Sequence, residues 1–212
     1  RARRGDAQQH QHAPRHAGFV REPGAAEIGG PSRYTAAVDA APFLVEVGRA
    51  LGAVSLDAVL IGNAGAALQG APVTTLDFDF LFRRTPRNLA KLKQFASRLE
   101  ATVLRPYYPV SDLFRVVRDD GLQVDFMGTV HGVRSYEGVR ARATIVDVAG
   151  VAIAVAALAD IIKSKKAAGR PQDLAVVHVL ERAHARQETA KASEESKSPS
   201  RRARPRKRSR AR

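Results

Sequence analysis

The residues with the clearest chemical potential are two aspartates in a short segment rich in phenylalanine. Asp77 and Asp79 flank Phe78 within Thr74 to Phe82, a run in which large apolar residues occupy every second position. Residues two apart on a β-strand point to the same face, so both carboxylates are predicted to project together while the phenylalanines pack on the other face. Neighbouring carboxylates repel each other at neutral pH unless a cation lies between them or one takes up a proton. The pair therefore predicts a divalent metal site.

A glycine turn upstream favours this site over the alternative, which is a solvated acidic face at a sheet edge. Asp57 to Ile61 is a mostly apolar run that predicts a buried strand ending at Gly62. Asn63 is predicted to cap a helix of about two turns that ends near Gly70. Backbone N–H groups at a helix N-terminus attract anions, so a phosphate group is expected beside the metal, as a nucleoside triphosphate requires.

A third carboxylate is expected from a neighbouring strand if the site binds two metal ions. Leu113 to Val117 and Leu122 to Met127 are two runs typical of strands, and the pair Asp120-Gly121 between them is a strong hairpin signal. Asp125 lies in the second run between two large apolar residues, so its side chain should point opposite to them and could meet the aspartate pair. The alternative is that Asp125 lies on the wet face of the hairpin.

The order and spacing of these residues resemble the DNA polymerase β-type nucleotidyltransferase superfamily. The matching residues are Gly62-Asn63, then thirteen residues, Asp77-Phe78-Asp79, and Asp125 on a later strand. The segment from Asp160 to Leu174, DIIKSKKAAGRPQDL, is similar to the Lys…Gly-Arg-x-x-Asp segment of small bacterial nucleotidyltransferases that include the AbiEii-type toxins. Together the matches extend from about Ala36 to Arg186.

The resemblance implies an α/β (α+β) fold, with a small mixed nucleotidyltransferase-type sheet, helices packed on it and a C-terminal helical pair. It implies metal-dependent transfer of a nucleoside monophosphate from a nucleoside triphosphate, with ATP among the candidates, to a hydroxyl group on RNA, protein or a small molecule. The residues it assigns to catalysis and to Mg²⁺ or Mn²⁺ binding are Asp77, Asp79 and Asp125. Those it assigns to nucleotide binding are Gly62, Asn63 and Lys165. It also suggests a toxin–antitoxin role with a cognate antitoxin as partner.

Two departures from the family pattern leave a second hypothesis open. Asn63 stands where many members have glycine or serine, and Pro72 to Thr75 stands where a basic residue often precedes the aspartate pair. The alternative is a non-catalytic protein of this fold that binds RNA or a partner protein through its basic tail.

Composition divides the chain of 212 residues into one folded domain and two tails. Residues 1–32 are rich in Arg, Gln, His, Gly and Pro and contain almost no large aliphatic side chains, so they are predicted to be disordered. Residues 34–186 are predicted to form the nucleotidyltransferase-like domain, and residues 187–212 a disordered basic tail. Much of the net charge of +14 lies in that tail, which predicts non-specific, salt-sensitive affinity for RNA or DNA.

Two absences in the composition bear on location. The chain contains no cysteine, which excludes disulfides and thiolate metal sites and fits a cytoplasmic location. No apolar run approaches the roughly 20 residues that a membrane-spanning helix needs, so a membrane is not an expected partner.

Apolar periodicity predicts the elements that support the site. Helices are expected at about residues 36–51, 87–101, 156–168 and 172–185, and strands at 102–104, 143–148 and 151–155. Residues 128–138 are expected to form a loop with one helical turn. His131 and Arg134 in this loop are candidate substrate contacts, because loops beside a site often bind the substrate.

The lysine that matches the family pattern has a structural alternative. Lys165 lies with Lys163 and Lys166 near the C-terminal end of a predicted helix, where cations suit the helix dipole. Arg170 is expected to pair with Asp173 and to fix the turn between the last two helices, which is a structural role for Asp173.

Overall fold

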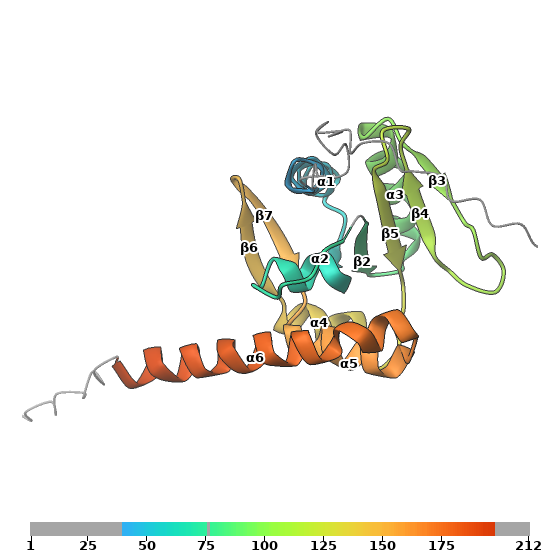
Figure 1. Cartoon of the computed structure of the whole chain (residues 1–212). Helices are drawn as coiled ribbons and strands as arrows, with labels where there is room; N and C mark the ends of the chain where they lie inside the picture. The colour runs from blue at the N-terminus through green and yellow to red at the C-terminus, as the bar shows by residue number, and fades with distance from the viewer. Residues whose placement is uncertain (1–39, 76, 198–212) are drawn as a thin grey trace, which may run out of the picture. The chain divides into compact units, whose positions relative to one another are not determined.

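The computed structural model describes residues 40–75 and 77–197, which form a seven-stranded mixed sheet and six helices (Figure 1). The strands are β1 Ala58–Leu60, β2 Phe78–Phe82, β3 Thr102–Leu104, β4 Phe114–Val117, β5 Gln123–Met127, β6 Thr144–Val148 and β7 Val151–Val155. The helices are α1 Ala41–Val54, α2 Gly62–Ala67, α3 Pro86–Arg98, α4 Tyr136–Arg142, α5 Leu158–Ala168 and α6 Pro171–Lys197. The predicted α/β (α+β) fold class is confirmed. The predicted disordered segment 1–32, Leu76 and the tail residues 198–212 lie outside the described residues.

The strand order places the two aspartate-bearing strands side by side near the middle of the sheet. The order is β3-β4-β5-β2-β1-β7-β6. β2 pairs in parallel with β5, and β1 pairs in parallel with β7, whereas the other neighbours are antiparallel. The β4–β5 hairpin turns at Asp120 and Gly121, as predicted, and Gly121 has a φ of 93°, which a residue without a Cβ tolerates.

Alternation along the strands divides the core between the two faces of the sheet. The phenylalanines of β2 pack with α1 and α3 on one face, in a cluster that also contains Phe95 and Phe126. The ring centroid of Phe126 lies 5.2 Å from that of Phe95 and 5.5 Å from that of Phe80. Buried side chains of α2, α4, α5 and α6 pack on the opposite face, together with Leu81 of β2. Asp79 shares the strand face of Leu81 and therefore points toward those helices.

The start of the aspartate strand differs from the prediction. The alternating sequence pattern predicted that this strand begins at Thr74, but β2 begins at Phe78. The Thr75 hydroxyl donates to the Asp77 carbonyl at 2.9 Å and to the Asp77 carboxylate at 2.8 Å. These local hydrogen bonds offer the backbone an alternative to the sheet ladder, so Asp77 lies in a bend just before the strand.

The start of the short helix after β1 also differs from the prediction. α2 begins at Gly62 with Ile61 at its N-cap, so Asn63 is inside the helix and is not its capping residue. The Nδ2 atom of Asn63 instead donates to the Thr74 carbonyl at 3.3 Å, which ties α2 to the segment that leads into the aspartate pair.

Two helices extend into segments that were predicted to be irregular. α4, Tyr136–Arg142, begins in the segment where a loop with one helical turn was expected and is longer than that turn, and the hydroxyl of Ser135 caps it by accepting from the Gly138 N–H at 3.1 Å. α6 continues to Lys197, so residues 187–197, assigned to the disordered tail, are helical. This stretch is rich in alanine, glutamate and lysine, which favour helix without needing tertiary contacts. Among the described residues no helix is long and apolar enough to cross a membrane.

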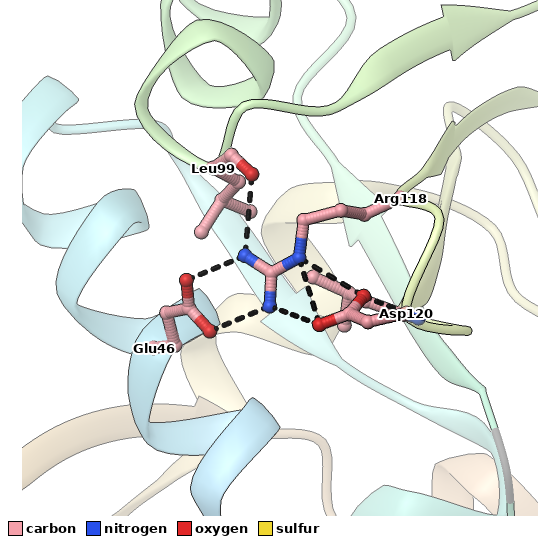
Figure 2. A network of polar contacts seen from close by, with 5 residues as sticks. Glu46, Leu99, Arg118 and Asp120 are labelled. Atoms are coloured by element: carbon pink, nitrogen blue, oxygen red, sulfur yellow. Dashed lines mark hydrogen bonds and ion pairs between the residues drawn. The ribbon is translucent and has the colours of Figure 1, made fainter.

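One arginine ties α1, the end of α3 and the β4–β5 hairpin together (Figure 2). The guanidinium of Arg118 donates to both carboxylate oxygens of Glu46 in α1, at 2.6 and 2.8 Å. It also donates to Asp120 in the hairpin turn, at 2.9 and 3.0 Å, and to the Leu99 carbonyl at 3.2 Å. The hydrogen bond from Arg118 holds the pKa of Glu46 below its usual value, although burial opposes this effect.

Replacing this arginine is expected to destabilise the domain. Arg118→Met keeps the aliphatic stem but removes every hydrogen bond of the guanidinium, and it should lower the free energy of unfolding by about 1–2 kcal/mol. The loss is moderate because the Glu46 and Asp120 side chains are each 45% exposed, so water replaces part of the interaction. Urea unfolding of Arg118→Met and of Arg98→Met, at an exposed position in α3, would measure it. Equal stability of the two variants would contradict the proposed contribution of the Arg118 hydrogen bonds to stability.

Candidate functional site

A single cleft of about 780 Å³ contains all of the residues that the family resemblance assigned to chemistry. Its lining includes Gly62 and Asn63 of α2, Asp77 and Asp79 at the start of β2, Asp125 of β5 and Lys165 of α5. His131 also lines the cleft, whereas Arg134 is not among the described residues that do.

Three carboxylates, from β2, from the bend just before it and from the adjacent strand β5, converge in this cleft. One carboxylate oxygen from each of Asp77, Asp79 and Asp125 lies within 4.8 Å of the others. The convergence follows from strand pairing, because Asp79 and Asp125 are direct partners in the parallel β2–β5 register. Asp125 is buried, with 5% of its surface exposed, so it does not lie on a wet face of the hairpin.

The electrostatics of Asp79 reflect an excess of negative charge. Burial raises the pKa of the Asp79 carboxyl to about 6, and the neighbouring charges of Asp77 and Asp125 add to the increase. Lys165 and Arg170 act in the opposite direction but do not cancel the effect. Near neutral pH this group therefore carries a charge that the surrounding protein compensates only in part.

Asp125 has a partner that was not predicted from the sequence. The Arg115 guanidinium, on β4, donates from Nε to Oδ1 of Asp125 at 2.8 Å and from Nη2 to Oδ2 at 2.6 Å. This hydrogen bond raises the pKa of Arg115, burial opposes the increase, and the nearby Tyr107 and Asp77 add smaller increases. Arg115 thus balances one of the three negative charges, and Tyr107 lines the same cleft.

The glycine turn contacts the aspartate pair directly. Gly62 has a φ of 65°, and a Cβ built on it would lie 2.2 Å from Oδ2 of Asp79, so only glycine fits both the conformation and the space. The Asn63 Oδ1 atom is buried and has no hydrogen-bond partner among the described residues. The amide nitrogen of Asn63 donates to the Thr74 carbonyl, and the side-chain oxygen is an acceptor that a ligand could use.

Lys165 is held in the cleft by a buried aspartate. Its Nζ donates to Oδ1 of Asp173 at 3.0 Å, while the guanidinium of Arg170 binds the other oxygen of that carboxylate. Burial works against ionisation of Asp173, but the hydrogen bonds from Arg170 and Lys165 outweigh it and hold the pKa of the carboxyl below its ordinary value. The predicted Arg170–Asp173 pair is therefore present, and the same carboxylate also fixes Lys165.

Comparisons with known proteins bear on the fold. No protein-family model matches the sequence, and none of the curated proteins matches it. The crystal structure of ANT(2″)-Ia in complex with adenylyl-2″-tobramycin is similar, with a TM-score of 0.50 and 14% identity over 73% of this chain and 92% of that chain. The chain has a nucleotidyltransferase-type fold. Two further similar structures are a solution structure of the antibiotic-resistance factor ANT(2″)-Ia and a candidate nucleotidyltransferase from Thermotoga maritima.

Both of these structures have lower TM-scores with this chain than the crystal structure of ANT(2″)-Ia has. The solution structure has a TM-score of 0.49 and 12% identity, over 74% of this chain and 95% of that chain. The Thermotoga maritima protein has a TM-score of 0.45 and 19% identity, over 73% of this chain and 92% of that chain.

Within this nucleotidyltransferase-type fold, sequence reasoning missed the partners of two predicted site residues. Arg115 could have been found, since the Asp120-Gly121 turn sets the β4–β5 register in which Arg115 faces Asp125. The contact between Lys165 and Asp173 has a weaker signal, because it depends on how α5 and α6 cross after Gly169, which has a φ of 65°.

The raised pKa of Asp79 predicts a distinctive pH dependence of stability. Without metal, the folded protein binds one more proton than the unfolded chain between about pH 4 and pH 6, so this group makes folding less favourable as pH rises through that window. The Asp79→Asn variant cannot titrate there. Its advantage in the free energy of unfolding over the parent should therefore grow by about 2 kcal/mol between pH 4 and pH 7. Urea unfolding of both proteins at each pH measures this difference, and a constant difference would contradict it.

Proposed function

We propose that the protein is a metal-dependent nucleotidyltransferase that moves a nucleoside monophosphate from a nucleoside triphosphate to a hydroxyl acceptor. The observation that carries the proposal is the convergence of three carboxylates beside Gly62 and Lys165 in one cleft. A cleft in which anionic and cationic groups face a common space is what a metal–triphosphate complex requires.

The residues present fit a divalent cation. Mg²⁺ and Mn²⁺ prefer carboxylate oxygens, and Asp77, Asp79 and Asp125 supply them without a competing thiolate or imidazole in the cluster. The raised pKa of Asp79 supports the same assignment, because a cation would relieve the repulsion that raises it. When bound, the metal would neutralise phosphate charge and lower the pKa of the acceptor hydroxyl.

The other residues of the cleft have defined roles in this proposal. Lys165, fixed by Asp173, would bind the phosphate oxygens that leave as pyrophosphate. Gly62 would let the backbone approach the triphosphate, as its space beside Asp79 allows. The buried acceptor of Asn63 would receive a hydrogen bond from a ribose hydroxyl of the nucleotide.

The reaction would be an in-line displacement at the α-phosphorus. The acceptor oxygen would form a bond to the α-phosphorus as the bond from that phosphorus to the bridging oxygen breaks, the hydroxyl proton would pass to water, and pyrophosphate would leave. Catalysis of this kind depends on positioning and charge stabilisation, which the rigid strands β2 and β5 can provide.

The experiment that tests the proposal follows the label of each α-³²P nucleoside triphosphate. The protein would be incubated with Mg²⁺ or Mn²⁺ and, in turn, with total RNA, a cell lysate and an aminoglycoside such as tobramycin. The similar structure of ANT(2″)-Ia contains adenylylated tobramycin, which makes a small hydroxyl-bearing acceptor one class to include. Label transfer that EDTA abolishes supports the proposal. Metal-independent RNA binding without transfer would instead support the non-catalytic alternative.

The more detailed assignments stay predictions. An AbiEii-like subtype with a cognate antitoxin predicts that growth arrest on expression is relieved by a co-expressed partner that copurifies with the protein. A cytoplasmic location depends only on the composition of the chain.

A further inference from the structure

The loop between β3 and β4 concentrates exposed apolar side chains beside the cleft. Within residues 104–110 the exposed fractions are 42% for Leu104, 56% for Tyr107, 63% for Tyr108 and 95% for Val110. Single exposed apolar residues are ordinary on protein surfaces, but a group of them next to a cleft is typical of a binding surface.

This loop is held in place by polar contacts. The Arg105 guanidinium carbon lies 3.9 Å from the ring centroid of Tyr108, and Asp112 pairs with both Arg105 and Arg84. The Ser111 N–H donates to the Tyr107 carbonyl at 2.8 Å. The ring of Tyr108 is thus covered by a cation, whereas the ring of Tyr107 has no aromatic or guanidinium partner among the described residues.

Tyr107 lines the cleft that contains the three aspartates. It lines the cleft together with Ser111, Leu113 and Arg115. Arg115 binds Asp125 through both of its carboxylate oxygens. Under the proposed function Asp125 faces the acceptor hydroxyl, and Tyr107 lines the same cleft, where a bound acceptor could reach it.

We propose that Tyr107 binds the acceptor, and that this acceptor is a single-stranded RNA whose terminal base stacks on the tyrosine ring. This inference rests on the proposed function. An open aromatic ring beside basic side chains is how proteins bind single-stranded nucleic acids, because every base has a flat π face. Arg84, which lies between β2 and α3, and Arg105 of the loop share one carboxylate, Asp112, so these three side chains together carry one positive charge that attracts phosphates. The net charge of +14 acts in the same direction and disfavours a polycationic acceptor.

The chain contains no tryptophan, so one substitution creates a reporter for stacking. Tyr107→Trp would be titrated with a short oligoadenylate, without metal or nucleotide, while its fluorescence is recorded. Tyr108→Trp is the matched control. It places the same indole one residue away, at a position where Arg105 covers the aromatic ring. We expect saturable quenching of Tyr107→Trp and much weaker quenching of Tyr108→Trp. Tyr107→Ala should bind the oligoadenylate about tenfold more weakly than the parent protein.

Two results would overturn the inference. One is equal oligoadenylate affinity of the parent and Tyr107→Ala, and the other is saturable quenching by tobramycin or a serine-containing peptide but not by RNA. Mn²⁺ binding by Tyr107→Ala, measured in parallel, separates this inference from the proposed function. If Mn²⁺ binding is intact while RNA binding fails the test, only the acceptor assignment is lost. If Mn²⁺ does not bind the parent protein, the proposed function itself is contradicted.

Discussion

Replacing Asp79 with asparagine is expected to abolish nucleotidyl transfer while making the protein more stable. The substitution removes one carboxylate of the converging three, and transfer should fall by on the order of 10³-fold. Stability should increase near neutral pH, because the charge of Asp79 is held in an unfavourable environment that raises its pKa to about 6. A simultaneous gain in stability and loss of activity is typical of a residue kept for function.

The measurements and the control are direct. Label transfer and Mn²⁺ affinity would be compared for Asp79→Asn, Asp77→Asn and Asp119→Asn. Asp119 is an exposed carboxylate in the hairpin turn and does not line the cleft, so its variant should behave like the parent protein. Retained transfer in Asp77→Asn and Asp79→Asn would remove the carboxylates from the proposed mechanism.

Replacing Gly62 with alanine is expected to impair the site by a steric clash, without changing its charge. The new Cβ would lie 2.2 Å from Oδ2 of Asp79, so that side chain must move, and the φ of 65° adds backbone strain of about 1 kcal/mol. A displacement of about 1 Å in a reacting group can cost on the order of 10²-fold in rate, and we expect a loss of that size in label transfer.

Gly70→Ala provides a matched control for this prediction. Gly70 also has a positive φ, 81°, but a Cβ built on it would meet nothing within 4 Å. Its variant should therefore lose about 1 kcal/mol of stability from strain and keep its activity. If both glycine variants retained full transfer, the contact between the glycine turn and Asp79 would have no catalytic meaning.

Much of the sheet could be predicted because its signals are local. The alternation in β2 assigned the phenylalanines to one face, and the Asp120-Gly121 pair located the hairpin that carries Asp125. Apolar periodicity located most helices to within a few residues. The gathering of the three aspartates in one cleft was expected from the family resemblance and from strand geometry together.

Most of the features that could not be predicted depend on contacts between different elements. The bond from Asn63 to Thr74 arises where α2 meets the chain before β2, whereas the bend at Asp77 comes from local hydrogen bonds with Thr75 that interrupt the alternating pattern. The fixing of Lys165 by Asp173 depends on how two helices cross. The helix from residue 187 to residue 197 begins with a hydrogen bond from Gln187 Nε2 to the Gln69 carbonyl at 2.7 Å, a contact that the sequence does not signal, and its composition equally fits a disordered tail.

Because β2 pairs with β5, the cleft can form only after β5 has been synthesised. Asp79 and Asp125 are adjacent in space but distant along the polypeptide, and α3, β3 and β4 lie between them. When β2 has emerged from the ribosome but β5 has not, the nascent chain therefore carries Asp77 and Asp79 without Asp125. Because parallel strands pair through long connections, which form slowly, the enzyme chemistry proposed for this chain would arise only late in folding.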